Sequence, residues 1–223
     1  MGSFAFLLPV WFALILSLSL LGVFEPADPP RPPIARGLAV LVPIILPVLG
    51  YTFSAGFRRR LLALDLGLLT IAQSWRIAGL TFLTLYALRL LPDLFAIPAG
   101  LGDIFVGLTA PAIATRVVSS LPARRGLFIA WTLFGMLDLI VAVSLGVISS
   151  LTPLGLVDGL RPPAVLTRLP LSLIPTFTVP LLFDLHVASL VLLRARSRPQ
   201  CAPHEAVSEI VDERVRVGLD PVT

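Results

Sequence analysis

Long apolar stretches alternate with short polar connections along this chain. Each stretch is close to the about 20 residues that an α-helix needs to cross the hydrocarbon core of a bilayer. The first stretch lacks a basic leading segment and a small-residue cleavage pattern, so we expect it to stay as a span instead of being removed as a signal peptide. The pattern predicts an all-α polytopic membrane protein, a six-transmembrane-helix bundle with spans at about 4–24, 36–56, 67–91, 94–116, 127–149 and 169–193.

The six spans form one predicted membrane domain over residues 1–198, followed by a polar cytoplasmic tail over residues 199–223. Within the tail, residues 204–217 carry aliphatic side chains at helical spacing, and Gly218 follows them as a stop signal. A short amphipathic helix and a disordered segment are both compatible with this composition.

Three of the predicted spans contain two or more prolines. Proline removes a backbone N–H donor and clashes with the preceding helical turn, so kinked or broken helices are expected there. Unwound backbone at membrane depth is tolerated where it lines a cavity or is buried in protein. The prolines concerned are Pro43 and Pro47 in the second span, Pro98 and Pro111 in the fourth, and Pro170, Pro175 and Pro180 in the sixth.

The composition excludes an ordinary soluble domain. Hydrophobic residues make up 57% of the chain and charged residues only 13%, against about 25% charged in soluble domains. All 17 basic residues are arginine, a bias that we attribute to a high-GC bacterial genome, so we expect a multi-pass protein of the bacterial inner membrane. The net charge of +4 does not indicate nucleic-acid binding, because the arginines gather at the ends of apolar stretches.

The arginines also predict the orientation of the spans. They are dense after the second, fourth and sixth spans and sparse after the third, and cytoplasmic connections carry the excess of basic residues. Both termini are therefore expected in the cytoplasm. Anionic lipid headgroups are the expected partners of Arg58, Arg59, Arg60, Arg124 and Arg125.

No sequence motif indicates a cofactor or a metal. The single cysteine, Cys201, lies in the tail, and only one of the two histidines, His186, lies in a span. Zinc-binding patterns, the serine nucleophile elbow and the phosphate-binding loop do not occur in the sequence. We therefore expect no bound cofactor and no metal.

Several polar and ionisable residues lie inside the apolar spans and form the candidate site. A charge at the centre of a membrane helix costs roughly 2.5–3.5 kcal/mol on insertion scales, so such residues usually face a partner, a cavity or a pathway. At about 1.5 Å per residue, the charged members lie about 10–20 Å from the predicted cytoplasmic edge, within one slab of the bilayer. The candidate substrate or ion pathway comprises Arg76, Gln73, Asp103, Asp138, Asp184 and His186.

Helical phase separates these residues further. Asp103 and Asp138 each belong to a row of small residues that lets another helix approach, which favours inward-facing positions. Asp184 and His186 are two residues apart, about 200° around a helix, so they cannot point at one centre. The sharpest expectation is that Arg76 pairs with Asp103 or Asp138. Such a pair serves either as a structural lock between helices or as part of a pathway, and both interpretations stay open.

Two local resemblances involve the fourth span. The segment LPDLFAIPAGLGD, residues 91–103, resembles the form L-P-x-x-F-A-x-P-A-G-x-G-D of small uncharacterised bacterial membrane proteins, and this resemblance implies no activity. Gly100–Asp103 also resembles the G-x-G-D motif of presenilin-type intramembrane aspartyl proteases, which implies Asp103 and Asp138 as a catalytic pair. In those proteases the partner aspartate precedes G-x-G-D, whereas Asp138 follows it, and no P-A-L motif occurs in a span.

These features favour a small-solute or proton-linked permease that uses the buried Arg, Asp and His residues, and they favour a non-enzymatic role. In transporters, discontinuous helices near the midplane build substrate and ion sites, and buried carboxylates relay protons. The alternatives are a non-catalytic membrane assembly or partner protein and an intramembrane aspartyl protease. A homodimer or another membrane subunit is compatible with the sequence, which identifies neither substrate nor coupling ion.

Overall fold

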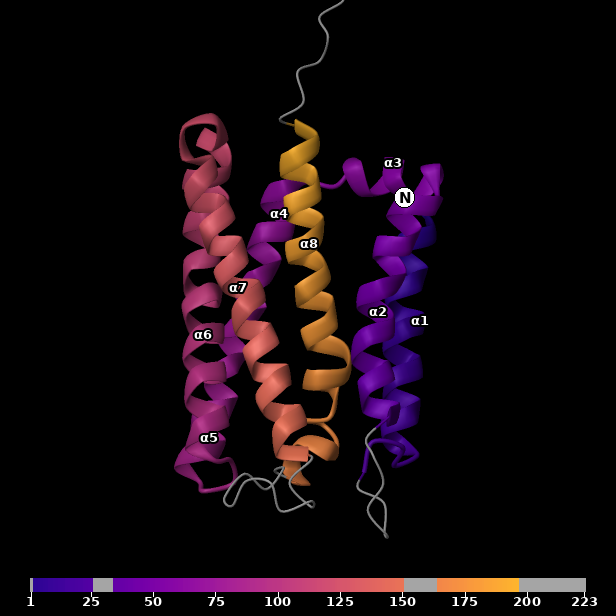
Figure 1. The fold of residues 1–223 in the computed structure, drawn as a ribbon, viewed down its shortest axis with the longest axis vertical. Coiled ribbons are helices and arrows are strands. Elements are labelled where there is room, and N and C mark those ends of the chain that lie inside the picture. Colours follow the sequence, from indigo (N-terminus) through magenta and orange to yellow (C-terminus); the bar gives the residue numbers. More distant parts are fainter. Residues whose placement is uncertain (1, 26–33, 151–163, 197–223) are drawn as a thin grey trace, which may run out of the picture.

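A computed structural model describes residues 2–25, 34–150 and 164–196, and all regular secondary structure in these ranges is helical (Figure 1). The predicted all-helical class is therefore confirmed, while the predicted tail over residues 199–223 lies outside the described residues. The α-helices are α1 (Gly2–Leu20), α2 (Ile34–Phe53), α3 (Ala55–Leu62), α4 (Leu66–Ala72), α5 (Leu80–Ala87), α6 (Asp93–Ala112), α7 (Leu121–Ser150) and α8 (Val179–Arg196). Shorter 3-10 or π-helical segments are η1 (Gln73–Gly79), η2 (Ile113–Val117), η3 (Val118–Ser120), η5 (Ala164–Thr167) and η6 (Ile174–Thr178).

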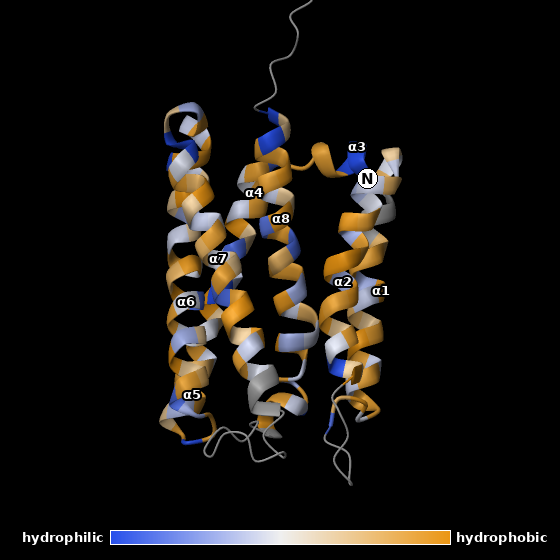
Figure 2. Cartoon of the chain, in the orientation of Figure 1, coloured by the Kyte–Doolittle hydropathy of each residue, from blue (hydrophilic) through white to orange (hydrophobic). Residues whose placement is uncertain are grey.

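Several helical segments are apolar and long enough to cross a membrane. Among the described residues there are four such segments, Ile34–Phe53, Leu66–Ala87, Asp93–Gly146 and Ile174–Arg196, and Phe6–Leu20 adds a shorter apolar helix. The third of these segments contains both α6 and α7, which pack against each other as the two arms of a hairpin (Figure 1). Figure 2 shows hydrophobic residues along the length of every long helix, which is the surface expected of a protein solvated by lipid.

The helices form two groups on either side of α8 (Figure 1). On one side, α6 packs against η1, α5 and α7, and α8 packs against α4 and α7. On the other side, α2 packs against α8 and η6, and α1 packs against η6. The short helix α3 crosses the end of the molecule between α2 and α4 (Figure 1).

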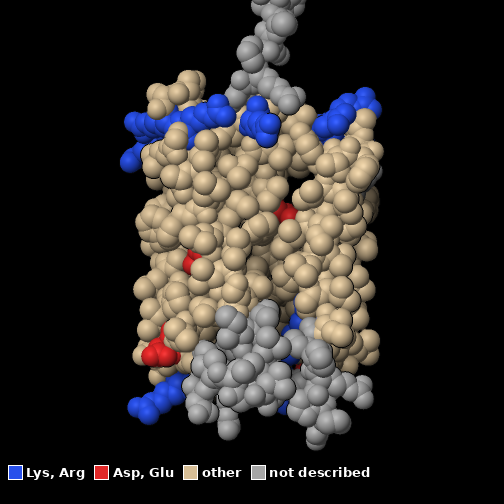
Figure 3. Space-filling view, viewed as in Figure 1, with Lys and Arg blue, Asp and Glu red and all other residues tan. Residues whose placement is uncertain are grey.

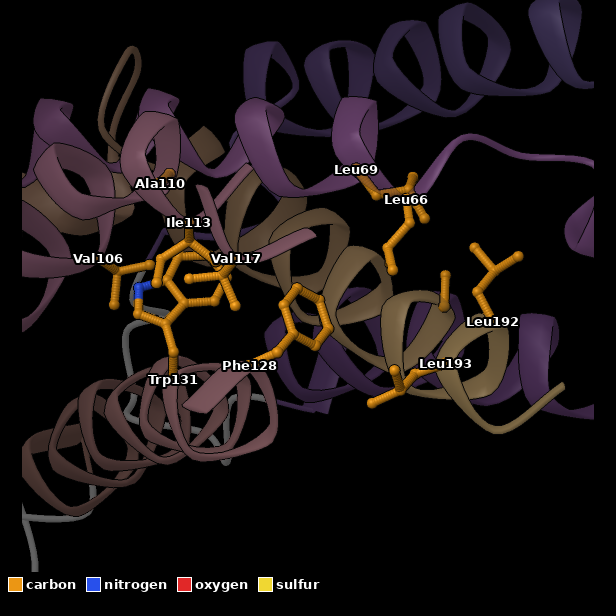
Figure 4. Packing of buried hydrophobic residues seen from close by; sticks show 11 residues of the cluster. Leu66, Leu69, Val106, Ala110, Ile113, Val117, Phe128, Trp131, Leu192 and Leu193 are labelled. Atoms are coloured by element: carbon orange, nitrogen blue, oxygen red, sulfur yellow. The ribbon is translucent and has the colours of Figure 1, made fainter. Parts of the chain in front are cut away.

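The main hydrophobic cluster joins α4, the α6–α7 hairpin and α8 (Figure 4). Phe128 and Leu66 are fully buried in this cluster, and Trp131 is also buried. Lipid tails are as apolar as leucine, so this cluster stabilises the bundle through close packing more than through burial from water. A second cluster, around Phe82 and Phe95, joins α5 to α6.

The helix breaks correspond only in part to the prolines. The π-helical segment η6 contains Pro175, and η2 begins two residues after Pro111. By contrast, α2 runs as a continuous α-helix through Pro43 and Pro47, and α6 does so through Pro98. The 3-10 segment η1 interrupts the helix from Leu66 to Ala87 and contains no proline. Segments of this kind inside membrane helices are frequent at functional sites.

Exposed arginines gather at one end of the molecule (Figure 3). We call this group the arginine belt; its members are Arg58, Arg59, Arg60, Arg116, Arg124, Arg125, Arg194 and Arg196. They come from α3, from η2, from the start of α7 and from the last turn of α8. The helix α1 begins and α8 ends at this same end (Figure 1). Charge is therefore distributed asymmetrically along the long axis of the bundle.

Candidate functional site

Arg76 lies in η1, in the interior of the bundle, and is 1% exposed. Its Nε donates to Asp103 Oδ1 at 2.7 Å, and its Nη2 donates to Asp138 Oδ2. Its Nη1 donates to the carbonyl oxygen of Gly135 at 2.9 Å and lies 3.2 Å from His186 Nε2. The expected contact between Arg76 and an aspartate is therefore present, and it involves both aspartates. We call Arg76, Asp103, Asp138 and His186 the Arg76 cluster.

Four elements meet at this cluster, because η1, α6, α7 and α8 each contribute one of its side chains. In Figure 1, α6, α7 and α8 lie next to one another, and η1 packs against α6. A guanidinium group has five N–H donors in a fixed fork, which suits it to bind several acceptors at once. Arg76 thus connects three other elements that are separate in sequence.

Trp131 links the cluster to the hydrophobic packing. Its ring contacts the His186 ring edge-on, with the ring centroids 5.5 Å apart. Its indole Nε1 donates to Thr109 Oγ1 at 2.8 Å, so the polar edge of the ring has a partner on α6. Trp131 was not among the candidate site residues. The contact between Trp131 and His186 depends on how α7 and α8 approach each other. Sequence spacing within a single helix does not determine that approach.

Glycines provide the space in which the cluster forms. A Cβ atom on Gly102 would overlap the carboxylate of Asp138, and one on Gly79 would overlap Asp103. A Cβ on Gly135 would lie 2.5 Å from His186 Nε2 and 3.1 Å from Arg76 Nη1. Real Cβ contacts are essentially never shorter than 3.0 Å, so no other residue fits these positions without displacing the cluster.

Gln73 lies one helical turn before Arg76 and is also buried. Its Nε2 donates to the carbonyl oxygen of Leu182 on α8 at 3.1 Å. Its Oε1 has no hydrogen-bond partner among the described residues, and the same holds for Oγ1 of Thr132 on α7. Both side chains are at least 99% buried. The interior near Arg76 therefore retains unused hydrogen-bonding capacity, a property of sites that hold water or a polar solute.

Asp184 does not join the cluster. His186, two residues further along α8, points at Arg76, so the Asp184 carboxylate is directed to the other side of the helix. The structure thus brings together five of the six candidate site residues at or beside the cluster and separates Asp184 from them.

The hydrogen bonds define what the cluster can do. Because a guanidinium can only donate, His186 Nε2 accepts, and the imidazole is neutral with its proton on Nδ1. Each aspartate has its own N–H partner on Arg76, whereas an aspartyl protease needs two carboxylates that share one proton. The described residues contain no group of three or more His, Cys, Asp or Glu side chains that could hold a metal ion.

Comparisons with known proteins identify a family but no activity. Neither a curated protein nor a solved structure matches the chain significantly. A family described as a domain of unknown function (DUF8737) matches residues 33–194, which include every member of the Arg76 cluster. Since this match covers more than half of the chain, the protein belongs to the DUF8737 family.

Proposed function

We propose that this protein is a proton-linked permease of the bacterial inner membrane and that the Arg76 cluster is its proton-binding element. The observation that carries this proposal is the number of charges in the cluster: two carboxylates bind one guanidinium. With His186 neutral, the cluster has a net charge of −1 when both aspartates are ionised.

A net charge inside a bilayer is unfavourable in free energy. Binding of one proton to either carboxylate makes the cluster neutral and removes this penalty. The side chains of Asp103 and Asp138 are 16% and 9% exposed, whereas that of Arg76 is 0% exposed. The carboxylates are thus less buried than the guanidinium group that they bind. A buried carboxylate that takes up and releases a proton is the element that couples proton movement to transport in many carriers.

The breaks in the membrane helices also support transport. Arg76 itself lies in the 3-10 segment η1, and η6 precedes α8, which carries His186. Discontinuous helices near the midplane are a recurring way to build substrate sites in transporters. They also provide positions where one part of a helix can move relative to the other.

We further propose six crossings with both chain ends in the cytoplasm. The crossings would be α1, α2, the stretch from α4 to α5, α6, α7 and the stretch from η6 to α8. The arginine belt supports this orientation, because basic residues favour the cytoplasmic side. In that orientation the belt contacts the anionic lipid headgroups of the inner leaflet.

Proton uptake by the protein in liposomes tests the proposal. Purified protein would be reconstituted with the pH indicator pyranine inside, and amines, amino acids and sugars would be added outside in separate experiments. We expect at least one of these probes to acidify the lumen with the wild-type protein.

Asp138→Asn is the informative variant. The asparagine oxygen can still accept from Arg76, but the cluster becomes neutral without a proton, so we expect the variant to fold and to lose proton uptake. Asp93→Asn is the matched control, since Asp93 is an aspartate at the start of α6, outside the cluster. Normal uptake by Asp138→Asn, or no uptake by folded wild-type protein with any probe, would refute the proposal.

A non-catalytic role as a partner of another membrane protein is the second candidate. It is favoured by α2, a 20-residue apolar helix that has no buried residue in the described chain. A partner subunit could cover such a helix as well as lipid does. In this case Asp138→Asn has no effect beyond stability, and the protein co-purifies from detergent with another membrane protein. The protease alternative has less support, because Arg76 binds each of the two carboxylates.

A further inference from the structure

The two polar side chains in the middle of α8 serve different parts of the molecule. His186 joins the Arg76 cluster, whereas Asp184 lies about 200° away around the helix. Phe177 belongs to the π-helical segment η6, and Asp184 follows it by seven residues, roughly two turns, so both residues lie on the same side of the continuous helix formed by η6 and α8. Phe177 contacts Trp11 and Phe12 of α1, with ring centroids 4.6 and 5.1 Å apart. Asp184 is therefore on the side of α8 that faces the N-terminal helices.

The described residues supply no counter-charge to the Asp184 carboxylate. It forms no hydrogen bond or ion pair with any residue in the described ranges, although it is half-buried. It lies about 18 Å from Arg196 along the helix, well inside the apolar layer. The helices packed on this side supply no cation near it: α1 contains no charged residue, and Arg36 of α2 lies at the end of that helix away from the arginine belt.

The charged residues of the other neighbouring elements either lie in the arginine belt or form an ion pair with another residue. Arg58, Arg59 and Arg60 of α3 are exposed at the end of the molecule. On α7, Asp138 binds Arg76. Within the described chain, a carboxylate at this depth thus lacks the partner that its ionised form requires. A bound cation would supply that partner.

The region between η6–α8 and α1 also contains aromatic rings. We call it the N-terminal seam and define it by Asp184, Phe177, Trp11, Phe12, and the hydrogen-bonded pair Ser19 and Ser172. Aromatic rings offer a large apolar surface against which the apolar part of an organic solute can pack. The rings lie about 10 Å along the helix axis from Asp184, a separation that a small molecule with an ammonium group at one end and an apolar part at the other can span.

Trp11 carries a buried polar group that is not satisfied by the described residues. Its indole Nε1 is buried, and it has no acceptor among the described residues. A buried indole N–H normally has a hydrogen-bond partner, because leaving it unpaired costs free energy. The seam therefore contains both an unpaired acceptor, at Asp184, and an unpaired donor, at Trp11.

We propose that the N-terminal seam binds a small organic monocation. Its ammonium group pairs with the Asp184 carboxylate, and its apolar part packs against Phe177, Trp11 and Phe12. The residues concerned are all outside the Arg76 cluster, so this site exists whether or not the cluster moves protons. If the protein is a permease, the seam assigns its solute to the class of organic amines.

Equilibrium binding tests the site without any gradient or flux. The full-length protein in lipid nanodiscs would be titrated calorimetrically with benzylammonium chloride, with empty nanodiscs as the blank. Benzyl alcohol is the neutral probe of similar shape, and sodium chloride is the inorganic probe. We expect saturable binding of benzylammonium, about tenfold weaker binding of benzyl alcohol, and no competition from sodium at equal concentration.

Variants assign the binding to the seam. Asp184→Asn should weaken benzylammonium binding by about tenfold or more, Asp184→Glu should retain it, and Trp11→Leu should weaken it several-fold. Asp93→Asn should bind as the wild type does. Equal affinity of Asp184→Asn and wild type, or of benzylammonium and benzyl alcohol, would overturn the proposal. So would displacement by sodium, which would indicate an inorganic cation site, or a lack of binding by both the wild type and Asp184→Glu.

Discussion

Gly102→Ala offers the most direct test of how the Arg76 cluster is built. The added methyl group would occupy space that the Asp138 carboxylate fills. Asp138 has a short side chain that is held by Arg76 Nη2, so the carboxylate cannot move aside without losing that ion pair. The alternative is a shift of α6 away from α7, which would disturb the packing of the whole hairpin.

The magnitude follows from the competing effects. Replacing glycine by alanine inside a helix is favourable by about 1 kcal/mol. Loss of one partner from a buried ion pair lowers the free energy of unfolding by about 3–5 kcal/mol. Overpacking without loss of the ion pair lowers it by about 1–3 kcal/mol. If the ion pair is lost, the free energy of unfolding therefore falls by about 2–4 kcal/mol.

A double-mutant cycle measured by reversible unfolding in mixed micelles, followed by circular dichroism, isolates this effect. Without the Asp138 carboxylate the methyl group has space, so Gly102→Ala should stabilise the Asp138→Ala background by up to about 1 kcal/mol while destabilising the wild type. Gly126→Ala is the control, because nothing lies within 4 Å of a Cβ at that position. The same effect of Gly102→Ala in both backgrounds would show that the overlap with Asp138 does not exist.

Two further predictions concern parts of the fold that hold the cluster in place. Phe128 is 0% exposed at the centre of the main hydrophobic cluster, so Phe128→Ala should lower the free energy of unfolding by about 3–5 kcal/mol. Leu127 is 54% exposed, so Leu127→Ala should have a much smaller effect in the same unfolding assay. The Asp65 side chain caps α4 by accepting a hydrogen bond from Leu68 N at 2.8 Å. Asp65→Ala should lower the free energy of unfolding by about 1 kcal/mol, and Asp65→Asn should lower it by less. Equal losses for both variants would contradict the capping role.

The sequence was sufficient to place the cluster at one depth, because helical rise converts sequence position into distance from the membrane edge. Small residues beside Asp103 and Asp138 indicated correctly that these carboxylates face other helices. Helical phase correctly separated Asp184 from His186. These inferences succeed because they depend on geometry within single helices, which sequence spacing determines.

Features that depend on how helices approach one another were not predictable. The sequence suggested that Arg76 pairs with one aspartate, whereas it binds both, since its fork lies between α6 and α7. The Gly135 carbonyl oxygen becomes an acceptor only because no side chain covers it at that crossing. The segment η1 contains no proline, so the sequence did not indicate a break in the helix there. The arginine-rich connection after the second span forms the helix α3, which was not expected.

The position of Arg76 also has a consequence for how the chain enters the membrane during synthesis. Leu66–Ala87 has the lowest mean hydropathy of the four long apolar segments, and a central arginine adds roughly 2.5–3.5 kcal/mol to its insertion cost. Its two counter-charges follow 27 and 62 residues later in the chain. At about 5–20 residues per second, the second of them is translated about 3–12 s after Arg76. With the proposed crossings, we expect this segment to be only marginally stable in lipid until α6 and α7 arrive. We then expect the three segments to insert cooperatively instead of strictly one after another.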